Sequence, residues 1–314
     1  MADKVATRDA YGNALVKLGE TNPKIVVLDA DLSKSTKTAG FSKKFPERFF
    51  QMGIAEADMM GTAAGLATSD KIPFASTFAV FATGRAYDQI RNSIGYPGLN
   101  VKIAATHAGI TVGEDGGSHQ SIEDVTLMRV IPGMTVLNPA DATETEKLIF
   151  LAAQLDGPVY IRLGREPVSV IFDAQYQPEI GKAVLLREGT DATIAASGVM
   201  VERALLAADL LKENGVAVRV LNIHTIKPID TAAIIAAAQE TGAIVTAEEH
   251  SIIGGLASAV SEVVVRHYPV PMEFIGVQDR FGQSGTPAEL MAEYGLDPVH
   301  IVTAIEKAIS RKNA

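Results

Sequence analysis

Short strand-like runs alternate with helical patterns along the whole chain, and this alternation constrains the fold more than any other feature. The ranges that we predict as strands in the first half are 24–31, 72–78, 101–108, 134–139 and 158–164. Several of these runs are apolar without a break, which is typical of strands buried on both faces of a parallel sheet. A helix is predicted over 140–155, with Asp141 placed to cap its start and Glu144 three residues later. The pattern predicts an α/β domain with a doubly wound sheet.

A second, smaller α/β unit follows a segment that lacks sustained helical periodicity. Residues 169–189 are predicted to be a linker that runs onto an edge strand. The strands expected after it lie at 191–198, 216–223, 242–249 and 271–277. The helix predicted between the first two ends at Gly215, and its apolar face consists of Val201, Ala204, Leu205, Ala208 and Leu211. The predicted domains are therefore residues 1–168 and 190–314, both doubly wound.

The composition limits the chemistry that this chain can perform. With 28 basic and 37 acidic residues, the net charge is −9, which argues against nucleic acid or an anionic membrane as the main partner. No run approaches the ~18 apolar residues that span a bilayer, and the charged N-terminus lacks the apolar core of a signal peptide, so we expect a cytoplasmic protein. The absence of cysteine excludes disulfides and thiolate catalysis. Catalysis must come from His, Asp, Glu or Arg, or from a bound cofactor.

Residues 107–124 form the segment richest in groups that carry chemistry. His107 and His119 flank a glycine-rich run that contains Glu114 and Asp115, directly after a predicted strand. Ligands of open α/β sheets bind beyond the carboxyl ends of strands, so this loop is expected to line a site. A solvated polar loop is the alternative. The spacing of the two histidines does not place them one helical turn apart, and we predict no metal site.

Three further features are ambiguous when each is taken alone. Glu56 stands among apolar and small residues, either as a functional carboxylate or as a helix-start charge or structural ion pair. Phe78 and Phe81 follow a strand and could equally be core aromatics. Arg162 and Arg165 lie at the end of another strand, where a guanidinium group binds an anion or forms a surface salt bridge.

Together, the motifs along the chain resemble the C-terminal half of the transketolases. In order, they are ATR, LDADLSKS, GIAEADMMGTAAGLA, STFAVF, THAGITVGEDGGSHQ, MTVLNPAD and LGRE, and the resemblance covers nearly the whole chain. It implies a pyrimidine-binding domain and a transketolase C-terminal domain. The Gly-Asp-Gly and downstream Asn of the family's diphosphate-binding domain have no counterpart here. The resemblance therefore implies one subunit of a split enzyme that uses thiamine diphosphate.

The resemblance also implies a partner. An N-terminal subunit would hold the diphosphate and its Mg²⁺ (or Ca²⁺), and the active site would form between subunits of an α2β2 heterotetramer. On this view the chain is active only with that subunit. It would transfer a two-carbon ketol unit from a ketose phosphate to an aldose phosphate, a reaction of the pentose phosphate pathway.

The resemblance assigns roles to residues that bind the cofactor. Glu56 matches the glutamate that bonds a ring nitrogen of the aminopyrimidine, and so promotes loss of the proton from C2 of the thiazolium. Phe78 matches the residue that packs on the pyrimidine, and Phe81 extends that wall. Asp31 matches an aspartate near the cofactor. Gly84 stands where many transketolases have an aromatic residue, which leaves the completion of this pocket open.

The resemblance assigns a second set of residues to the sugar substrate. His107, Asp115 and His119 match residues that hold hydroxyls near the reacting carbon, and the two histidines join Glu56 as expected catalytic residues. Arg8, Ser35 and Arg165 match the ligands of the terminal phosphate. No catalysis is expected of the segment at Glu248, Glu249 and His250, where capping and interface packing are predicted.

Alternative functions remain at this stage. The motifs GIAEA and RAYDQI are also similar to 1-deoxyxylulose-5-phosphate synthases. The β subunit of the E1 component of a 2-oxo acid dehydrogenase shares the expected fold, but its substrate has no phosphate to engage Arg8, Ser35 and Arg165. A non-catalytic subunit is the remaining alternative, and the retained Glu56 argues against it.

Overall fold

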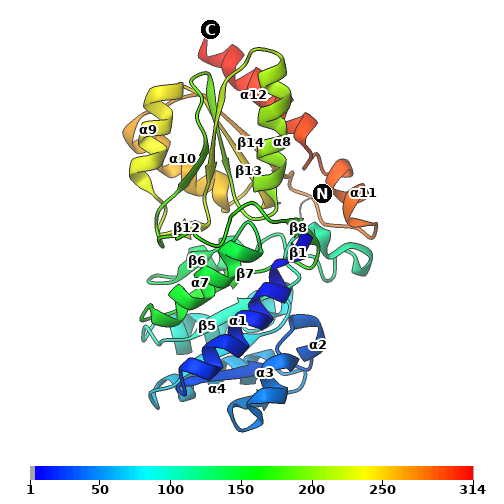
Figure 1. Cartoon of the computed structure of the whole chain (residues 1–314), viewed down its shortest axis with the longest axis vertical. Coiled ribbons are helices and arrows are strands. Elements are labelled where there is room, and N and C mark those ends of the chain that lie inside the picture. The colour runs from blue at the N-terminus through cyan, green and yellow to red at the C-terminus, as the bar shows by residue number, and fades with distance from the viewer. Residues whose placement is uncertain (1–3, 314) are drawn as a thin grey trace.

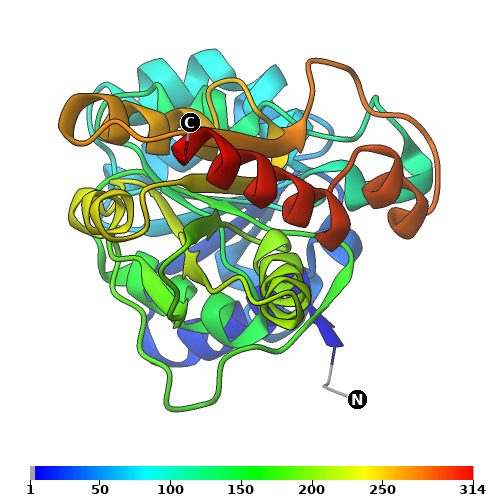
Figure 2. The same ribbon diagram turned by 90° about the horizontal axis from the view of Figure 1, so that it is seen from above.

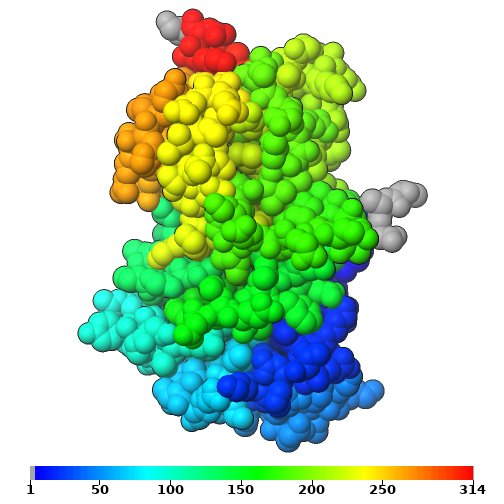
Figure 3. All heavy atoms as spheres, turned by 60° about the vertical axis from the view of Figure 1, so that its left-hand side comes forward, coloured from blue at the N-terminus to red at the C-terminus, as the bar shows by residue number. Residues whose placement is uncertain are grey.

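The computed structural model describes residues 4–313, which form two stacked α/β domains (Figure 1). The N-terminal domain lies at the bottom of that view and the C-terminal domain at the top. The view from above shows the helices of the C-terminal domain on both faces of its sheet (Figure 2). The space-filling view shows the two domains packed against each other, with the green central part of the chain between them (Figure 3). This architecture confirms the predicted two-domain α/β fold.

The larger sheet has seven strands among the described residues, in the order β12-β6-β7-β5-β4-β2-β3. Their bounds are β2 (Ile25–Asp29), β3 (Phe49–Gln51), β4 (Ile72–Ser76), β5 (Lys102–Ala105), β6 (Thr135–Leu137), β7 (Val159–Arg162) and β12 (Thr225–Lys227). All pairs are parallel except β12 with β6. A separate antiparallel pair joins β1 (Lys4–Ala6) to β8 (Pro167–Ser169). The sequence did not predict β3 or β12, because each has three residues and lies in no unbroken apolar run.

Helices cover both faces of this sheet. One face packs on α1 (Thr7–Thr21), α3 (Ala39–Lys44) and α7 (Ala142–Gln154), and the other on α4 (Glu56–Ala67) and α6 (Asp124–Arg129). The second face also carries π-helical turns, η2 (Phe81–Arg85) and η3 (Ile90–Gly95), on either side of α5 (Tyr87–Gln89). Two short elements, α2 (Ser33–Thr36) and η1 (Pro46–Arg48), complete the domain. Asp141 caps α7 as predicted and accepts the amide of Glu144 at 2.8 Å.

The C-terminal domain is built on a five-stranded sheet in the order β14-β13-β10-β11-β9. Its strands are β9 (Val184–Arg187), β10 (Ala192–Ala196), β11 (Val218–Asn222), β13 (Ile244–Ser251) and β14 (Met272–Val277), and only β9, the predicted edge strand, is antiparallel. One face packs on α8 (Met200–Glu213) and α12 (Pro298–Lys312), the other on α9 (Thr231–Thr241) and α10 (Leu256–His267). Helix α11 (Pro287–Glu293) packs instead on the turn Ile110–Asp115 of the N-terminal domain. Gly215, at φ +77°, follows the end of α8 as predicted.

The two domains share a continuous core. Apolar side chains under α4 and α6 of the first domain belong to the same buried cluster as Ile226 of β12 and Leu256 of α10. No helix within residues 4–313 is both long and apolar enough to cross a bilayer. The shared core and the pairing of β12 with β6 fix the C-terminal domain against the first sheet. This places the C-terminal domain next to the carboxyl end of β7, where Arg162 donates to the carbonyl of Glu249.

Candidate active site

The predicted site residues follow the carboxyl ends of four neighbouring strands. Asp31 and Ser35 come after β2, Phe78 after β4, His107 after β5 and Arg165 after β7. This is the edge of a doubly wound sheet at which ligands bind. The topology therefore gathers residues that lie far apart in the sequence.

A buried carboxylate shapes the loop after β2. Asp29 accepts hydrogen bonds from the amide of Leu32 at 2.6 Å and from the hydroxyls of Thr36 and Thr38 at 2.6 and 2.9 Å. Burial raises the pKa of Asp29, and these hydrogen bonds oppose the rise. Asp31 is exposed at φ +64°, and its amide donates to the side chain of Gln51 at 2.7 Å. The network fixes the backbone that carries Asp31 and Ser35.

Four rings form a continuous aromatic wall. The ring centroids of Phe78 and His107 lie 3.7 Å apart with a 23° tilt, and those of Phe78 and Phe81 lie 5.8 Å apart with a 15° tilt. His119 meets Phe81 edge-on at 5.4 Å. The structure thus brings two predicted cofactor residues and two predicted catalytic histidines together. Aromatic rings such as these suit packing against a planar heterocycle.

Glu56 is joined to this wall through Arg85. The side chain of Glu56, at the first residue of α4, is only 4% exposed, and its Oε1 accepts from Nη1 of Arg85 at 3.0 Å. The guanidinium of Arg85 also stacks on the Phe81 ring, 4.0 Å from its centroid. Since Arg85 is half exposed, the carboxylate is buried behind a side chain that reaches solvent. Within this chain, Glu56 is both a charge at the start of a helix and one partner of an ion pair, the two structural interpretations that the sequence allowed.

His107 is held by groups that keep it neutral. Its Nε2 lies 3.0 Å from Nη1 of Arg8, and its Nδ1 lies 2.9 Å from the hydroxyl of Thr106. Burial, followed by the charges of Arg8 and Arg165, lowers the pKa of His107 to about 3. Arg8 also donates to the carbonyl of Ser35 at 3.2 Å. Three predicted substrate residues, Arg8, Ser35 and His107, therefore meet.

Two further cations, Arg165 and Lys37, lie near His107. Nη1 of Arg165 donates to the carbonyl of Val112 and lies 3.5 Å from Oδ2 of Asp115, so two more predicted residues are neighbours. Lys37, at φ +70°, pairs with Asp9 at 2.9 Å, and its charge also lowers the pKa of His107. A partly buried cluster of cations suits a tetrahedral anion.

Arg162 does not belong to this cation cluster, although it is the last residue of β7, the strand that precedes Arg165. It is buried and turned toward Asp124, with Nε 2.8 Å from Oδ2. Within residues 4–313, the side chain of Asp31 makes no hydrogen bond or ion pair with another predicted site residue. Arg85 and Lys37 were not among the site residues predicted from the sequence. Arg85 lies four residues after Phe81, and this helical spacing could have identified it, whereas Lys37 gave no signal of its own.

The aromatic wall and Glu56 fit the aminopyrimidine half of thiamine diphosphate. A buried carboxylate suits a hydrogen bond to a ring nitrogen, and Phe78 and Phe81 suit the face of the ring. Within the described residues, no group of three or more His, Asp or Glu side chains is arranged to hold a metal ion.

Comparison with known proteins gives the same family in both domains. The family model "Transketolase, pyrimidine binding domain" matches residues 3–169, and the model "Transketolase, C-terminal domain" matches residues 181–301. A solved structure described as a split-gene transketolase in an inactive β4 tetramer is 57% identical, with a TM-score of 0.92 over 98% of this chain and 99% of that chain.

Sequence relatives fall into two groups by length. A Methanocaldococcus jannaschii protein, named a transketolase C-terminal section, is 48% identical over 97% of this chain and 96% of its own length. The 6-deoxy-6-sulfo-D-fructose transketolase subunit SqwH of a Clostridium species is 45% identical over 98% of this chain and 95% of that protein. Rat transketolase is 39% identical over 99% of this chain but only 50% of its own length. The predicted resemblance is confirmed: the chain belongs to the transketolase family and carries the pyrimidine-binding and C-terminal domains of that family.

Proposed function

We propose that this chain is the C-terminal subunit of a two-subunit transketolase that moves a two-carbon ketol unit from a ketose phosphate to an aldose phosphate. The observation that carries the proposal is the arrangement of Glu56, buried and joined through Arg85 to the Phe78–Phe81 wall. A carboxylate and an aromatic wall provide what one half of thiamine diphosphate requires.

Each residue of the arrangement has a proposed task. Glu56 holds a proton or hydrogen bond at the pyrimidine nitrogen, while Phe78 and Phe81 pack on the ring and exclude water. When bound, thiamine diphosphate supplies the nucleophilic carbon that accepts and passes on the ketol unit. His107, His119 and Asp115 orient the sugar hydroxyls, and positioning of this kind lowers the barrier by removing orientational freedom in advance.

The far end of the sugar is proposed to lie at the cations. Arg8 and Arg165 are the predicted phosphate ligands, the backbone of Ser35 already contacts Arg8, and Lys37 adds a third positive charge beside them. Charge-assisted hydrogen bonds from arginine to a tetrahedral anion are short and strong. Pyruvate, the substrate of the 2-oxo acid dehydrogenase alternative, has no group to place there.

The proposal includes an N-terminal partner subunit. That subunit would hold the diphosphate with Mg²⁺ and close the pocket beside Gly84. A Cβ added there would meet, among the described residues, no atom within 4 Å beyond its own helical turn. Two features of relatives support this partner. The part of rat transketolase that matches this chain is only 50% of that protein. The 57% identical split-gene chain is described as an inactive β4 tetramer. An α2β2 heterotetramer is the expected active assembly.

The test is reconstitution with the diphosphate-binding subunit encoded in the same genome, in the presence of thiamine diphosphate and Mg²⁺. Given xylulose 5-phosphate and ribose 5-phosphate, the pair should form sedoheptulose 7-phosphate, and either subunit alone should form none. Turnover of pyruvate without ketol transfer would contradict the proposal. Condensation of pyruvate with glyceraldehyde 3-phosphate would favour a 1-deoxyxylulose-5-phosphate synthase instead.

A sulfonated sugar is a second candidate substrate, favoured by the 45% identity to a 6-deoxy-6-sulfo-D-fructose transketolase subunit. A sulfonate is also a tetrahedral anion but carries one negative charge, whereas a phosphate ester approaches two near neutral pH. Comparing kcat/KM for fructose 6-phosphate and 6-deoxy-6-sulfofructose distinguishes them. With three cations at the site, we expect the phosphate to be preferred. A preference of tenfold or more for the sulfonate would reassign the substrate.

A further inference from the structure

The loop that carries the proposed substrate residues is held by the C-terminal domain. Residues 107–119 run from His107 to His119, and within them Ile110–Asp115 (η4) forms a turn against that domain. The side chain of Gln120 donates to the carbonyl of Gln283 at 2.9 Å, and Ser284 donates to the carbonyl of Glu114 at 2.8 Å. The loop is therefore not fixed by its own domain alone.

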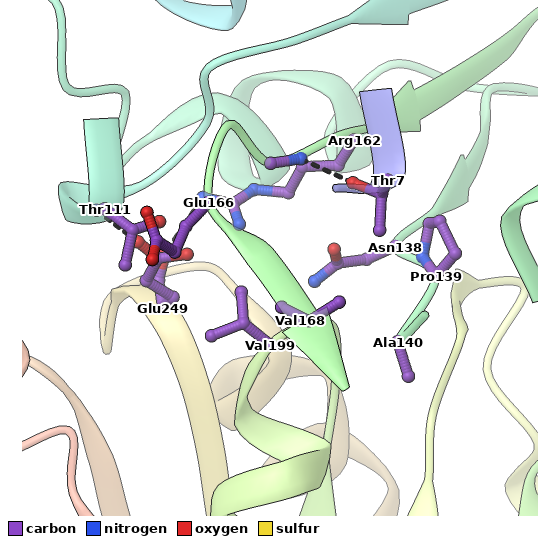
Figure 4. Close-up of a pocket in the computed structure, with 11 residues that line it drawn as sticks. Thr7, Thr111, Asn138, Pro139, Ala140, Arg162, Glu166, Val168, Val199 and Glu249 are labelled. Carbon is purple, nitrogen blue, oxygen red and sulfur yellow. Dashed lines mark hydrogen bonds between the residues drawn. The ribbon is translucent and has the colours of Figure 1, made fainter. Parts of the chain in front are cut away.

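The deepest of these contacts is made by Glu249 on β13. Its side chain is 1% exposed, and Oε1 accepts the amide of Thr111 at 2.6 Å (Figure 4). Its main-chain carbonyl accepts from Arg162 at 2.8 Å. The carboxylate thus reaches from the C-terminal domain to a backbone amide four residues after His107.

The glycine beside this contact shows how close the approach is. Gly109 has φ +82°, and a Cβ added there would lie 2.3 Å from the carboxylate of Glu249. Two backbone positions of the loop, Gly109 and Thr111, are consequently in contact with one side chain. Because His107 precedes them and Asp115 follows them, the contact with Glu249 fixes the backbone between two predicted substrate residues.

The remaining surroundings of Glu249 provide no alternative task within its own domain. Its Oε2 has no hydrogen-bond partner within residues 4–313 and borders a cavity of about 10 Å³ at the domain seam. Figure 4 shows that Thr7, Asn138 and Arg162 line the same seam. Burial raises the pKa of Glu249, and the charge of Arg162 opposes that rise. Burying a carboxylate is costly unless it is paired and hydrogen-bonded. The groups that offset this cost, the amide of Thr111 and the charge of Arg162, both belong to the N-terminal domain.

Glu248, the preceding residue, offers a matched comparison. It is equally buried, but it accepts the amides of Leu256 and Ala257 at 2.7 and 2.8 Å, and so caps α10 within its own domain. The capping predicted for this segment is therefore the work of Glu248. Adjacent carboxylates on one strand stabilise two different elements.

We propose that Glu249 is a positioning residue for the substrate site, which sets the 107–119 loop from the C-terminal domain through Thr111 and Gly109. It touches neither sugar nor cofactor. The kinetic part of this inference rests on the proposed ketol transfer, whereas its structural part does not.

The structural test is hydrogen–deuterium exchange on the isolated chain, which needs no activity. Glu249→Leu removes the hydrogen-bond acceptor. Glu249→Ser also removes it but lets water reach the amide of Thr111, so this second variant keeps the test usable if the leucine variant does not fold. Both should raise exchange over 108–116 at least tenfold. Glu249→Gln keeps an acceptor oxygen and should stay within threefold of wild type. Glu248→Leu should instead expose the start of α10.

The kinetic test uses the reconstituted pair. Glu249→Leu and Glu249→Ser should raise KM for the sugar phosphates about tenfold, with Glu249→Gln restoring it and Glu248→Leu leaving it near wild type. Unchanged exchange over 108–116, or an equal effect of Glu248→Leu on that loop, would overturn the inference. If the Glu249 variants alter exchange in the loop but the reconstituted wild-type pair transfers no ketol unit, the proposed function is contradicted and the role of Glu249 in holding the loop is not.

Discussion

Nη1 of Arg8 lies 3.0 Å from Nε2 of His107, so an arginine of α1 sets the proton position on a histidine that follows β5. Arginine has no lone pair to offer, and Nε2 must therefore be the acceptor. The proton of the neutral ring then resides on Nδ1, which faces the hydroxyl of Thr106 at 2.9 Å. In this state His107 presents a lone pair, and not a proton, to the cation cluster.

Arg8→Met should raise the pKa of His107 above its value of about 3. The charge of Arg8 is the second cause of the depression after burial, so the pKa should rise but remain below the ordinary value of about 6.5. NMR titration of the ring in the isolated chain measures it. Lys34→Met, which removes an exposed cation on α2, is the control. An unchanged or lower pKa in Arg8→Met would contradict the assigned contact.

Acid should weaken the fold partly through His107. Because its folded pKa of about 3 lies below its unfolded value, unfolding takes up a proton at this site between about pH 6.5 and 3. Its contribution to stability is thus complete above pH 6.5 and is lost as the pH falls. Relative to His107→Asn, the free energy of unfolding of the wild type should drop by about 2 kcal/mol from pH 7 to pH 5. Urea denaturation at both values measures this difference, which would stay constant if His107 titrated normally.

Glu56→Gln should lower turnover of the reconstituted pair by about 10²–10⁴-fold, the usual contribution of a positioned acid–base group. An amide keeps the volume of the side chain but cannot accept a proton in the same way. Asp58→Asn, on the same turn of α4 but exposed, is the matched control and should remain near wild type. Steady-state assay of both variants decides the role, and near-normal turnover of Glu56→Gln would refute it.

Lys37→Ala and Arg165→Ala should impair use of phosphorylated donors specifically. Loss of one hydrogen bond to a charged group should raise KM for xylulose 5-phosphate by about 10–100-fold. Hydroxypyruvate carries the ketol unit without a phosphate, so its KM should change little. Lys34→Ala again serves as the control. Equal losses with both donors would show that the cations support the fold and do not bind the phosphate.

Most strands of the two sheets were predictable because they lie in apolar runs long enough to show burial on both faces, as at Ile25–Asp29 and Ala192–Ala196. The cap at Asp141 was predictable because its signal is local. The strands β3 and β12 were not, since each has three residues and lies in no unbroken apolar run.

The residues of the candidate site were assigned one by one only through the family resemblance, and their roles stay predictions. Phe78 and Phe81 gave no sign of the ring of His107 at 3.7 Å, because that contact depends on the order of strands β4 and β5. The roles of Arg85 and Lys37 depend on tertiary contacts with Glu56 and with the cluster around His107. The position of Arg162 at a strand end allowed either an anion-binding role or a salt bridge, and only the structure shows that its side chain binds the buried Asp124.

Under the proposed function, this chain holds half of a cofactor site. Isothermal titration with thiamine diphosphate and Mg²⁺ on the chain alone and on the reconstituted pair measures this directly. The chain alone is expected to bind the cofactor at least about 100-fold more weakly than the pair, because the diphosphate lacks its ligands. Equally tight binding by the isolated chain and by the pair would refute a divided site.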